Sequence, residues 1–529
     1  EYPYTLTASK LFFNIESNIN FSRYYRSKKR GIPYYSYVPL LGSIWEPILQ
    51  RISFAETVEK IYLAFPDSKY IGFFDFSAPI VMIRDLELLK SITVKNFDHF
   101  PDHRSFDNDR DPLFSKNLFA LRGERWKEVR NMLSPAFTSS KMKAMFVLMR
   151  ECAKEYGDYF ASLPADQTTL ELKDSFTKYT NDVIATCAFG INVNSIKDPK
   201  NSFYVYGREA THFGRLQSIK FFVVRSLPWL AGALNIRIIK KHIVDFFQDL
   251  VATTIKTRDE KGIVRPDMLQ LMMETRGKLG PGKELTIEDM TAQAFVFFFG
   301  GFESTSTLMC FAAYEVGINE EVQRKLQDEI DQVLKDCKGE ATYEAINDMK
   351  YLDAVVLESL RMYPTIVAVD RLCVKPFELP PHLPGKKPYI VQENECIWIP
   401  IYGIQRDPQK YPEPNKFNPD RFNSDAKQML NSSSLFTFGL GPRMCIGNRF
   451  AILEAKVLLF YIFARCNLIP CAKTSIPLKL NKKGFAMTAE HGFWFNIQPR
   501  NIKKGEVEKI TVPGTTMFIE KIPDRHPDN

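Results

Sequence analysis

The chain has 529 residues and a formal net charge of +8, with 45% hydrophobic residues and 9 cysteines. An odd number of cysteines without regular spacing excludes a small secreted scaffold built on disulfides, and no C-x-x-C or H-E-x-x-H motif supports a zinc site. The charge excess is slight for this length. No stripe interleaves aromatic and basic residues, so nucleic-acid binding is excluded as well.

Residues 1–30 are polar at first and then basic and aromatic from Arg23 to Arg30. The polar part holds no apolar run long enough to span a bilayer, whereas the basic part suits an anionic membrane surface. We therefore expect a membrane anchor that is missing or lies upstream. Length alone would suggest three or four domains of ~150 residues, but no linker or repeat divides residues 31–500. Residues 501–529 form a polar C-terminal extension.

Two short strands are predicted at residues 70–76 and 80–83, on either side of a turn at residues 77–79. Further along, Trp126 and Arg130 have an i, i+4 spacing, which places both side chains on one face of a helix. The next notable segment, residues 219–240, is apolar with basic flanks. It fits a segment lying in a membrane interface and, equally well, an ordinary pair of buried helices broken at a proline.

A long apolar helix is predicted from Thr286 to about Asn319. Thr286 with an acidic residue three positions later is typical of a helix N-terminus. The most apolar part, residues 294–302, is shorter than the ~20 residues that a membrane span needs, so we expect a central helix of a large fold. Gly300 and Gly301 each cost roughly 1 kcal/mol relative to alanine inside a helix, and this cost calls for a functional reason.

Glu358 and Arg361 form an E-x-x-R pair on one helical face, and Pro364 predicts that this helix ends just before it. Alone, such a pair would be a solvated surface pair of little value. Arg421 lies shortly before the next motif, and Arg371 shortly after the helix.

Residues 438–447 fit the pattern F-x-x-G-x-R-x-C-x-G through Phe438, Gly441, Arg443, Cys445 and Gly447. Glycines let a backbone loop approach a large flat group closely, and a thiolate on such a loop suits a haem iron. Cys445 is then the metal ligand, with Phe438 shielding the sulfur and Arg443 pairing with a haem propionate. A lone buried cysteine in a glycine-rich turn is the simpler alternative, but five matched positions make it a poor explanation.

Together these motifs resemble the cytochrome P450 family of haem-thiolate monooxygenases, over most of the chain. The resemblance implies a mainly α fold with a smaller β-rich portion (α+β), formed by residues 31–500 as a single catalytic domain. It also implies haem b (iron protoporphyrin IX) buried between the long central helix and the Cys loop. The implied haem contacts are Trp126, Arg130, Arg371, Phe438, Gly441, Arg443 and Gly447, around the ligand Cys445. The implied structural triad, which supports the haem-binding loop, is Glu358, Arg361 and Arg421.

The resemblance further implies that the glycine pair widens the central helix locally and that Glu303, Ser304 and Thr305 deliver protons during oxygen activation. The chain departs from the family here, because Ser304 stands where threonine is usual. Serine keeps the hydroxyl but loses the methyl group that restricts χ1, so we expect poorer coupling of electron use to product formation.

Residues 102–106, 111–119 and 133–142 resemble insect microsomal members of the xenobiotic-metabolising clan. This implies oxidation of plant toxins, insecticides or endogenous lipophiles at the cytosolic face of the endoplasmic reticulum membrane. NADPH acts only indirectly, through NADPH-cytochrome P450 reductase, with cytochrome b5 as an optional second partner. Lys127, Arg443 and Arg449 are candidate bases for docking an acidic partner. Candidate pocket residues are Phe106, Phe114, Phe295, Phe298, Phe299, Val367, Phe485 and Met487.

Two other functions remain open at this stage. A haem-thiolate isomerase or dehydratase needs no oxygen activation, and Ser304 slightly favours it, whereas Glu303 and the neighbouring hydroxyls count against it. A lipophile-binding haem protein without turnover would show spectral shifts but no NADPH-dependent product.

Overall fold

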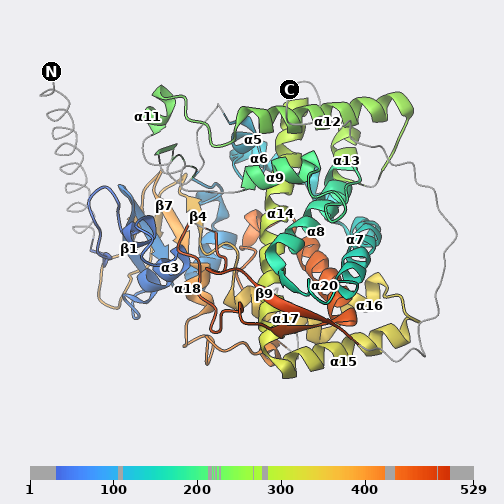
Figure 1. The fold of residues 1–529 in the computed structure, drawn as a ribbon. Coiled ribbons are helices and arrows are strands. Elements are labelled where there is room, and N and C mark those ends of the chain that lie inside the picture. Colours follow the sequence, from blue (N-terminus) through green and yellow to red (C-terminus); the bar gives the residue numbers. More distant parts are fainter. Residues whose placement is uncertain are drawn as a thin grey trace, which may run out of the picture.

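The computed structural model describes residues 31–500 apart from residues 105–110, 212–216, 218–219, 221–222, 225–227, 266, 277–283, 423–434 and 485. Figure 1 shows a helical part on the right, with α14 passing through its middle, and a group of strands on the left. The predicted fold class, mainly α with a smaller β-rich portion, is confirmed. The predicted segments 1–30 and 501–529 lie outside the described residues.

The helices that position the site alternate with shorter connecting helices along the chain. Their bounds are α2 (Trp45–Ile48), α3 (Phe54–Leu63), α4 (Leu86–Lys90), α5 (Pro112–Ser115), α6 (Gly123–Leu133), α7 (Ser139–Ala161), α8 (Leu172–Ile184), α9 (Ser202–Thr211), α11 (Pro228–Ala233), α12 (Lys241–Lys261), α13 (Met268–Glu274), α14 (Ile287–Ile318), α15 (Glu320–Asp336), α16 (Tyr343–Asp348), α17 (Lys350–Met362), α18 (Ile401–Gln405) and α20 (Asn448–Arg465).

Among the described residues the strands form three small sheets, with orders β1-β2-β7-β4, β3-β9-β8 and β5-β6. The strand bounds are β1 (Tyr70–Asp75), β2 (Ala78–Ile83), β3 (Thr169–Glu171), β4 (Val369–Leu372), β5 (Phe377–Leu379), β6 (Tyr389–Val391), β7 (Cys396–Ile399), β8 (Cys466–Pro470) and β9 (Trp494–Pro499).

The β1–β2 hairpin is present, but its turn lies earlier than predicted. Asp75 pairs with Ala78, so the turn consists of Phe76 and Ser77, and Phe76 adopts the left-handed region with φ 55°. Pro79 belongs to β2. It fits there because the pairing of β2 with β7 begins only at Ile80, so the missing N–H of the proline costs no bond to β7.

The helix predicted from Thr286 to Asn319 is confirmed as α14. Thr286 caps it and forms a capping box with Asp289, and Asn319 is its C-cap. Among the described helices, α14 is the one long and apolar enough to cross a membrane, but 61% of its most apolar window is buried. This burial is what a core helix requires.

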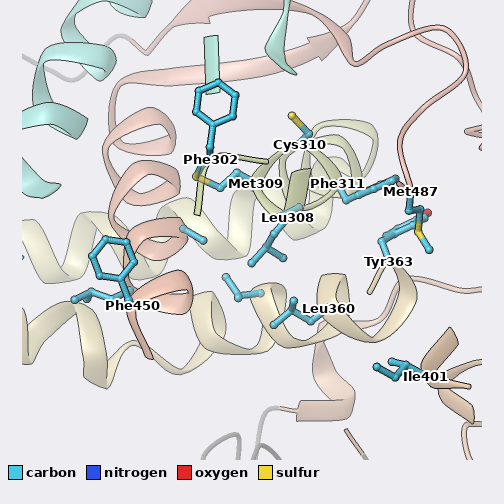
Figure 2. Close-up of a cluster of buried hydrophobic side chains, with 14 of the residues drawn as sticks. Phe302, Leu308, Met309, Cys310, Phe311, Leu360, Tyr363, Ile401, Phe450 and Met487 are labelled. Atoms are coloured by element: carbon cyan, nitrogen blue, oxygen red, sulfur yellow. The ribbon is translucent and has the colours of Figure 1, made fainter. Parts of the chain in front are cut away.

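Helices α5, α8, α12, α17 and α20 pack against α14. Figure 2 shows a cluster of buried hydrophobic side chains between these helices, which includes Leu308 of α14 and Leu360 of α17. One cluster of buried residues extends from Ile32 to Ile497. Helix α17 ends at Met362, as Pro364 predicted.

The apolar segment 219–240 is described only in part. Its described residues include Val224 and Ala231, which are buried and form a small cluster with Ile238, and Leu234, which is exposed. Pro228 begins α11. The buried residues agree with an ordinary helical segment, and the membrane-interface alternative is neither supported nor contradicted.

Candidate active site

The Cys loop is a tight turn that presents one thiol. The Cys445 N–H donates to the Phe438 carbonyl at 2.8 Å, and the Met444 N–H donates to the Gly441 carbonyl at 2.9 Å. Gly441 has φ 70°, and a Cβ at this position would lie 2.0 Å from the Thr93 carbonyl oxygen. The glycine is therefore required by the close approach of another protein segment. From the sequence we expected this glycine to let the loop approach a large flat group. The contact that the structure shows at Gly441 is with Thr93, and the role of Gly441 as a haem contact stays a prediction.

Cys445 has solvent-accessible surface, yet many protein atoms surround its thiol. The thiol therefore faces a space inside the protein and not the bulk solvent. Burial raises the pKa of this thiol, while the Gly447 N–H and the nearby Arg130 guanidinium lower it. Phe438, half-buried, belongs to the surrounding apolar cluster. Gly447 is the N-cap of α20 with an ordinary φ of −93°, and its role as a haem contact stays a prediction.

Arg130 and Arg371 lie near this interior space without carboxylate partners. Arg130 makes no ion pair or side-chain hydrogen bond with any residue that the structure describes, and burial lowers its pKa while Cys445 opposes that change. Arg371 is 1% exposed. Its Nη1 donates to the Asp370 carbonyl at 2.7 Å, while its Nε has no partner among the residues that the structure describes. Burial lowers the pKa of Arg371 to about 10, and the nearby Asp370 carboxylate opposes that change. Arg371 is buried and Arg130 is half-buried. A desolvated guanidinium without an anion is costly, so these two side chains fit an anionic group such as a haem propionate.

The other two predicted propionate contacts differ from each other. Trp126 is buried, and its indole N–H has no acceptor within the described part of the chain. Arg443 donates to the Pro101 carbonyl at 2.6 Å, to the Leu121 carbonyl at 2.8 Å and to Asp102 Oδ1 at 2.9 Å. Its guanidinium lies 4.0 Å from the Trp126 ring centroid. Arg443 is thus held mostly by protein groups, and because it is buried it cannot dock a partner, unlike Lys127, whose side chain is 52% exposed.

The structure brings Glu358, Arg361 and Arg421 together. Arg361 donates from Nε and Nη2 to the two oxygens of Glu358 at 2.7 and 2.9 Å, and Arg421 Nε donates to Glu358 Oε1 at 3.3 Å. The Asn418 N–H is a fourth donor, at 3.0 Å. Glu358 and Arg361 are fully buried, so this carboxylate depends on its partners entirely.

Gln405, which sequence reasoning missed, connects this triad to the Cys loop. Its Nε2 donates to the carbonyls of Leu360 and Arg361, both at 3.0 Å. Its Oε1 accepts from the Phe436 N–H at 3.1 Å and from the Thr437 hydroxyl at 3.0 Å. The side chain is fully buried, so α17 and the start of the Cys loop are held through one amide.

The middle of α14 is a continuous α-helix, without the local widening that the family resemblance implied. A Cβ at Gly301 would lie 2.5 Å from Ile184 Cδ1, whereas one at Gly300 would meet nothing within 4 Å. Gly301 therefore allows α8 to approach, and Gly300 borders open space. The Ser304 hydroxyl donates to the Gly300 carbonyl, which places it beside that space.

Thr305 faces a different direction from Ser304. Its hydroxyl is buried without a partner, and so are both carboxyl oxygens of Glu454 on α20. Burial raises the pKa of Glu454 well above its usual value, and the Thr305 hydroxyl is close enough to oppose this slightly, although no hydrogen bond of ordinary geometry joins them. Burial therefore favours the neutral form of this carboxyl. The proton-delivery role predicted for Thr305 remains a prediction.

The predicted pocket residues divide by burial. Phe114 and Phe299 are half-buried, with ring centroids 5.6 Å apart. Four others are at most 5% exposed and pack in the core, because neighbouring helices and loops cover them: Phe295, Phe298, Val367 and Met487. Figure 2 shows Met487 within such a cluster. Phe106 and Phe485 lie outside the described residues.

Ile366, beside the buried Val367, is 50% exposed. The Val367 carbonyl accepts from the Tyr402 N–H at 3.0 Å. This bond holds the loop in a conformation in which the Ile366 side chain, and not that of Val367, is exposed. Val367 stays a predicted pocket residue, and Ile366 is the more exposed of the two side chains.

Taken together, the described residues fit a haem. One accessible thiol, the half-buried Arg130, the buried Arg371 and an indole donor lie near one another. A family model described as Cytochrome P450 matches residues 53–494. Cytochrome P450 9e2 of Blattella germanica is 45% identical over 501 residues, which covers 89% of this chain and 93% of that protein. The corresponding values for Probable cytochrome P450 9f2 of Drosophila melanogaster are 41% over 492 residues, 90% and 95%. The chain belongs to the cytochrome P450 family and is an oxidoreductase.

Proposed function

We propose that the protein is a monooxygenase that transfers one oxygen atom of O2 to lipophilic substrates, with electrons from NADPH delivered by a reductase. The observation that carries the proposal is the accessible Cys445 thiol in an interior space with Arg130 and Arg371 beside it, both without carboxylate partners. A thiolate ligand favours O–O bond cleavage, and two cations match the two propionates of a haem.

The chain's own residues would hold the cofactor and exclude water. Cys445 would ligate the iron, and Arg130, Arg371 and the Trp126 N–H would bind the propionates. When bound, the haem supplies the reduction and cleavage of O2 and the transfer of one oxygen atom to the substrate. The overall reaction is RH + O2 + NADPH + H⁺ → ROH + H2O + NADP⁺.

The opposite wall of the space comes from α14 and the loop after α17. Gly300 leaves room on its side of α14, and the Ser304 hydroxyl, which donates to the Gly300 carbonyl, would be the group that passes a proton to the bound oxygen. Phe114, Phe299 and Ile366 are the apolar side chains open enough to contact a substrate. An apolar lining with few polar groups favours lipophilic ligands, in keeping with oxidation of plant toxins, insecticides or endogenous lipophiles.

We place the protein at the cytosolic face of the endoplasmic reticulum membrane, with NADPH-cytochrome P450 reductase as electron donor and cytochrome b5 as an optional second partner. The exposed Lys127, which pairs with Glu124 at 2.7 Å on the surface, is a candidate contact for an acidic partner. Electrostatic steering of such a partner would make the association rate fall with salt.

The test uses the haem-loaded full chain with reductase and NADPH in lipid vesicles, incubated with lipophilic toxins under ¹⁸O2. We expect products that carry a single heavy oxygen atom, detected by mass spectrometry. Turnover without NADPH would instead support an isomerase or dehydratase. Ligand-induced spectral shifts without any labelled product would support a binding protein.

A further inference from the structure

Gln293, near the start of α14, contacts the backbone of the loop that follows α5 at two points. Its Oε1 accepts from the Leu118 N–H at 2.8 Å, and its Nε2 donates to the Lys116 carbonyl at 2.7 Å. The side chain is fully buried. The amide has both an acceptor and a donor, so one residue joins α14 to this loop through two short hydrogen bonds.

The loop that Gln293 contacts is cross-linked internally by Asn117. The Asn117 Nδ2 donates to the Leu113 carbonyl at 2.8 Å, and its Oδ1 accepts from the Ala120 N–H at 3.1 Å. Asn117 is itself buried. Residues 113–120 are therefore joined into one unit, and a change at the contact with Gln293 is passed on to α5.

Phe114, on α5, extends from this unit toward the aromatic side chains of α14. Its ring centroid lies 5.6 Å from that of Phe299 and 6.1 Å from that of Phe295. It also packs against the small buried cluster around Ile238. Because Phe114 is half-buried, part of its surface remains open to a ligand. The place of this ring then sets the size and shape of the space beside it.

We propose that Gln293 is a positioning residue that determines which lipophiles the substrate space accepts, because it fixes the place of the Phe114 ring. The inference rests on the proposed function in one respect, the contact of Phe114 with the bound lipophile. Without the amide, the Leu118 N–H and the Lys116 carbonyl would lose this partner, and an unpaired buried group is costly. The loop would shift toward other partners or water, and the Phe114 ring would move with it.

Gln323 of α15 provides a matched control. Its Nε2 donates to the Leu468 carbonyl at 3.1 Å, and its Oε1 accepts from the Leu468 N–H at 2.8 Å. Gln323 is 8% exposed, so this amide also forms a buried two-point contact with backbone. Figure 1 shows α15 at the bottom of the molecule and α5 near the top. Gln323→Leu therefore removes the same kind of contact away from Phe114.

The test compares Gln293→Leu, Gln323→Leu, Phe114→Ala and the double variant Gln293→Leu/Phe114→Ala in the haem-loaded full chain. The probes are imidazole and 1-octylimidazole, whose ring nitrogen binds a haem iron and shifts its absorption spectrum. The readout is the ratio of the imidazole Kd to the 1-octylimidazole Kd, which reports on contacts with the apolar tail.

We expect Gln293→Leu and Phe114→Ala each to lower this ratio about threefold to tenfold, the loss of contact for one or two methylene groups. Gln323→Leu should leave the ratio unchanged. The double variant should match Phe114→Ala, because the position of the ring no longer matters once the ring is gone.

A second readout follows the loop itself. Hydrogen exchange of the peptide that contains Leu118, measured by mass spectrometry, should be faster in Gln293→Leu than in the wild type, because this N–H loses its acceptor. Gln323→Leu should instead accelerate exchange of the peptide that contains Leu468. Both changes should lower the urea midpoint of unfolding, since each leaves buried backbone groups unpaired.

Faster exchange at Leu118 with an unchanged Kd ratio in Gln293→Leu would overturn the inference and leave a purely structural contact. An equal change of the ratio in Gln323→Leu, or additive changes in the double variant, would overturn it as well. A wild type that binds 1-octylimidazole but forms no oxygenated product would overturn the proposed function and leave this inference standing. Absence of any spectral shift with either probe in the haem-loaded wild type would overturn both.

Discussion

Replacing Glu358 with glutamine should cost more stability than any exposed ion pair of the chain. The change removes one negative charge and leaves Arg361, fully buried, without a carboxylate. Breaking a buried pair by removing one partner costs ~3–5 kcal/mol. Glu358 accepts four hydrogen bonds, from Arg361 (two), Arg421 and Asn418. The glutamine NH2 group would face at least one of these donors, so we expect a loss of about 4 kcal/mol.

The free energy of unfolding can be measured from urea denaturation followed by circular dichroism. The matched control is Arg324→Ala, which removes an i, i+4 pair with Asp328 whose two side chains are both 64% exposed. It should cost at most about 0.5 kcal/mol. Because the cost of Glu358→Gln comes from an uncompensated charge, the double variant Glu358→Leu/Arg361→Leu should lose less than the sum of the two single changes.

The reasoning would be refuted by a loss for Glu358→Gln no larger than that for Arg324→Ala, or by strictly additive losses in the double variant. In either case the desolvated charge would not be the source of the stability. The triad would then contribute by shape alone.

Three further changes test the rest of the site. Gln405→Leu should destabilise the protein by about 3 kcal/mol in urea unfolding, because it leaves buried carbonyl and N–H groups unpaired. Arg371→Leu should weaken haem binding roughly 10- to 100-fold in a titration of the haem-free protein, since it removes a charge-assisted contact, while urea unfolding of the haem-free protein shows no loss. Glu454→Gln should raise stability at pH 7 by at most about 4 kcal/mol, the cost of protonating a free glutamate. Burial raises the pKa of Glu454, so the wild type loses stability as pH rises above about 4.3, and the difference between the two proteins should vanish near pH 4.

The sequence predicted best where local rules are strong. The capping pair Thr286 and Asp289 located the start of α14, and Pro364 located the end of α17. Fixed spacing also identified the groups that meet in space, such as Glu358 and Arg361, which a helix places together. These features depend on a few neighbouring residues and on backbone geometry, so they can be read without the fold.

The sequence was less informative about direction and about contacts between distant segments. Phe298 and Phe299 are adjacent and identical in type, yet one is fully buried and the other half-buried, because their directions depend on where α9 and α12 pack. Gly441 looked like a glycine for a cofactor but approaches Thr93. Gln293 and Gln405 carried no motif, since their partners are far from them in the chain.

The buried polar groups of this protein fall into two kinds, and the difference indicates which ones hold the site and which ones serve it. Glu358 and Gln405 have every strong partner they need within the chain, so they can only fix the backbone around the Cys loop. In the part of the chain that the structure describes, Arg371 Nε, the Thr305 hydroxyl and the Glu454 carboxyl have no hydrogen-bond partner. Buried polar atoms are rarely left this way in a finished fold. Arg371 lies near Arg443 of the Cys loop, whereas Thr305 of α14 and Glu454 of α20 lie beside each other and away from Ser304. An ordered water could satisfy the Thr305 and Glu454 groups, whereas the buried cation Arg371 calls for an anion. Of these groups, it is therefore Arg371 that indicates where the folded chain still needs a cofactor.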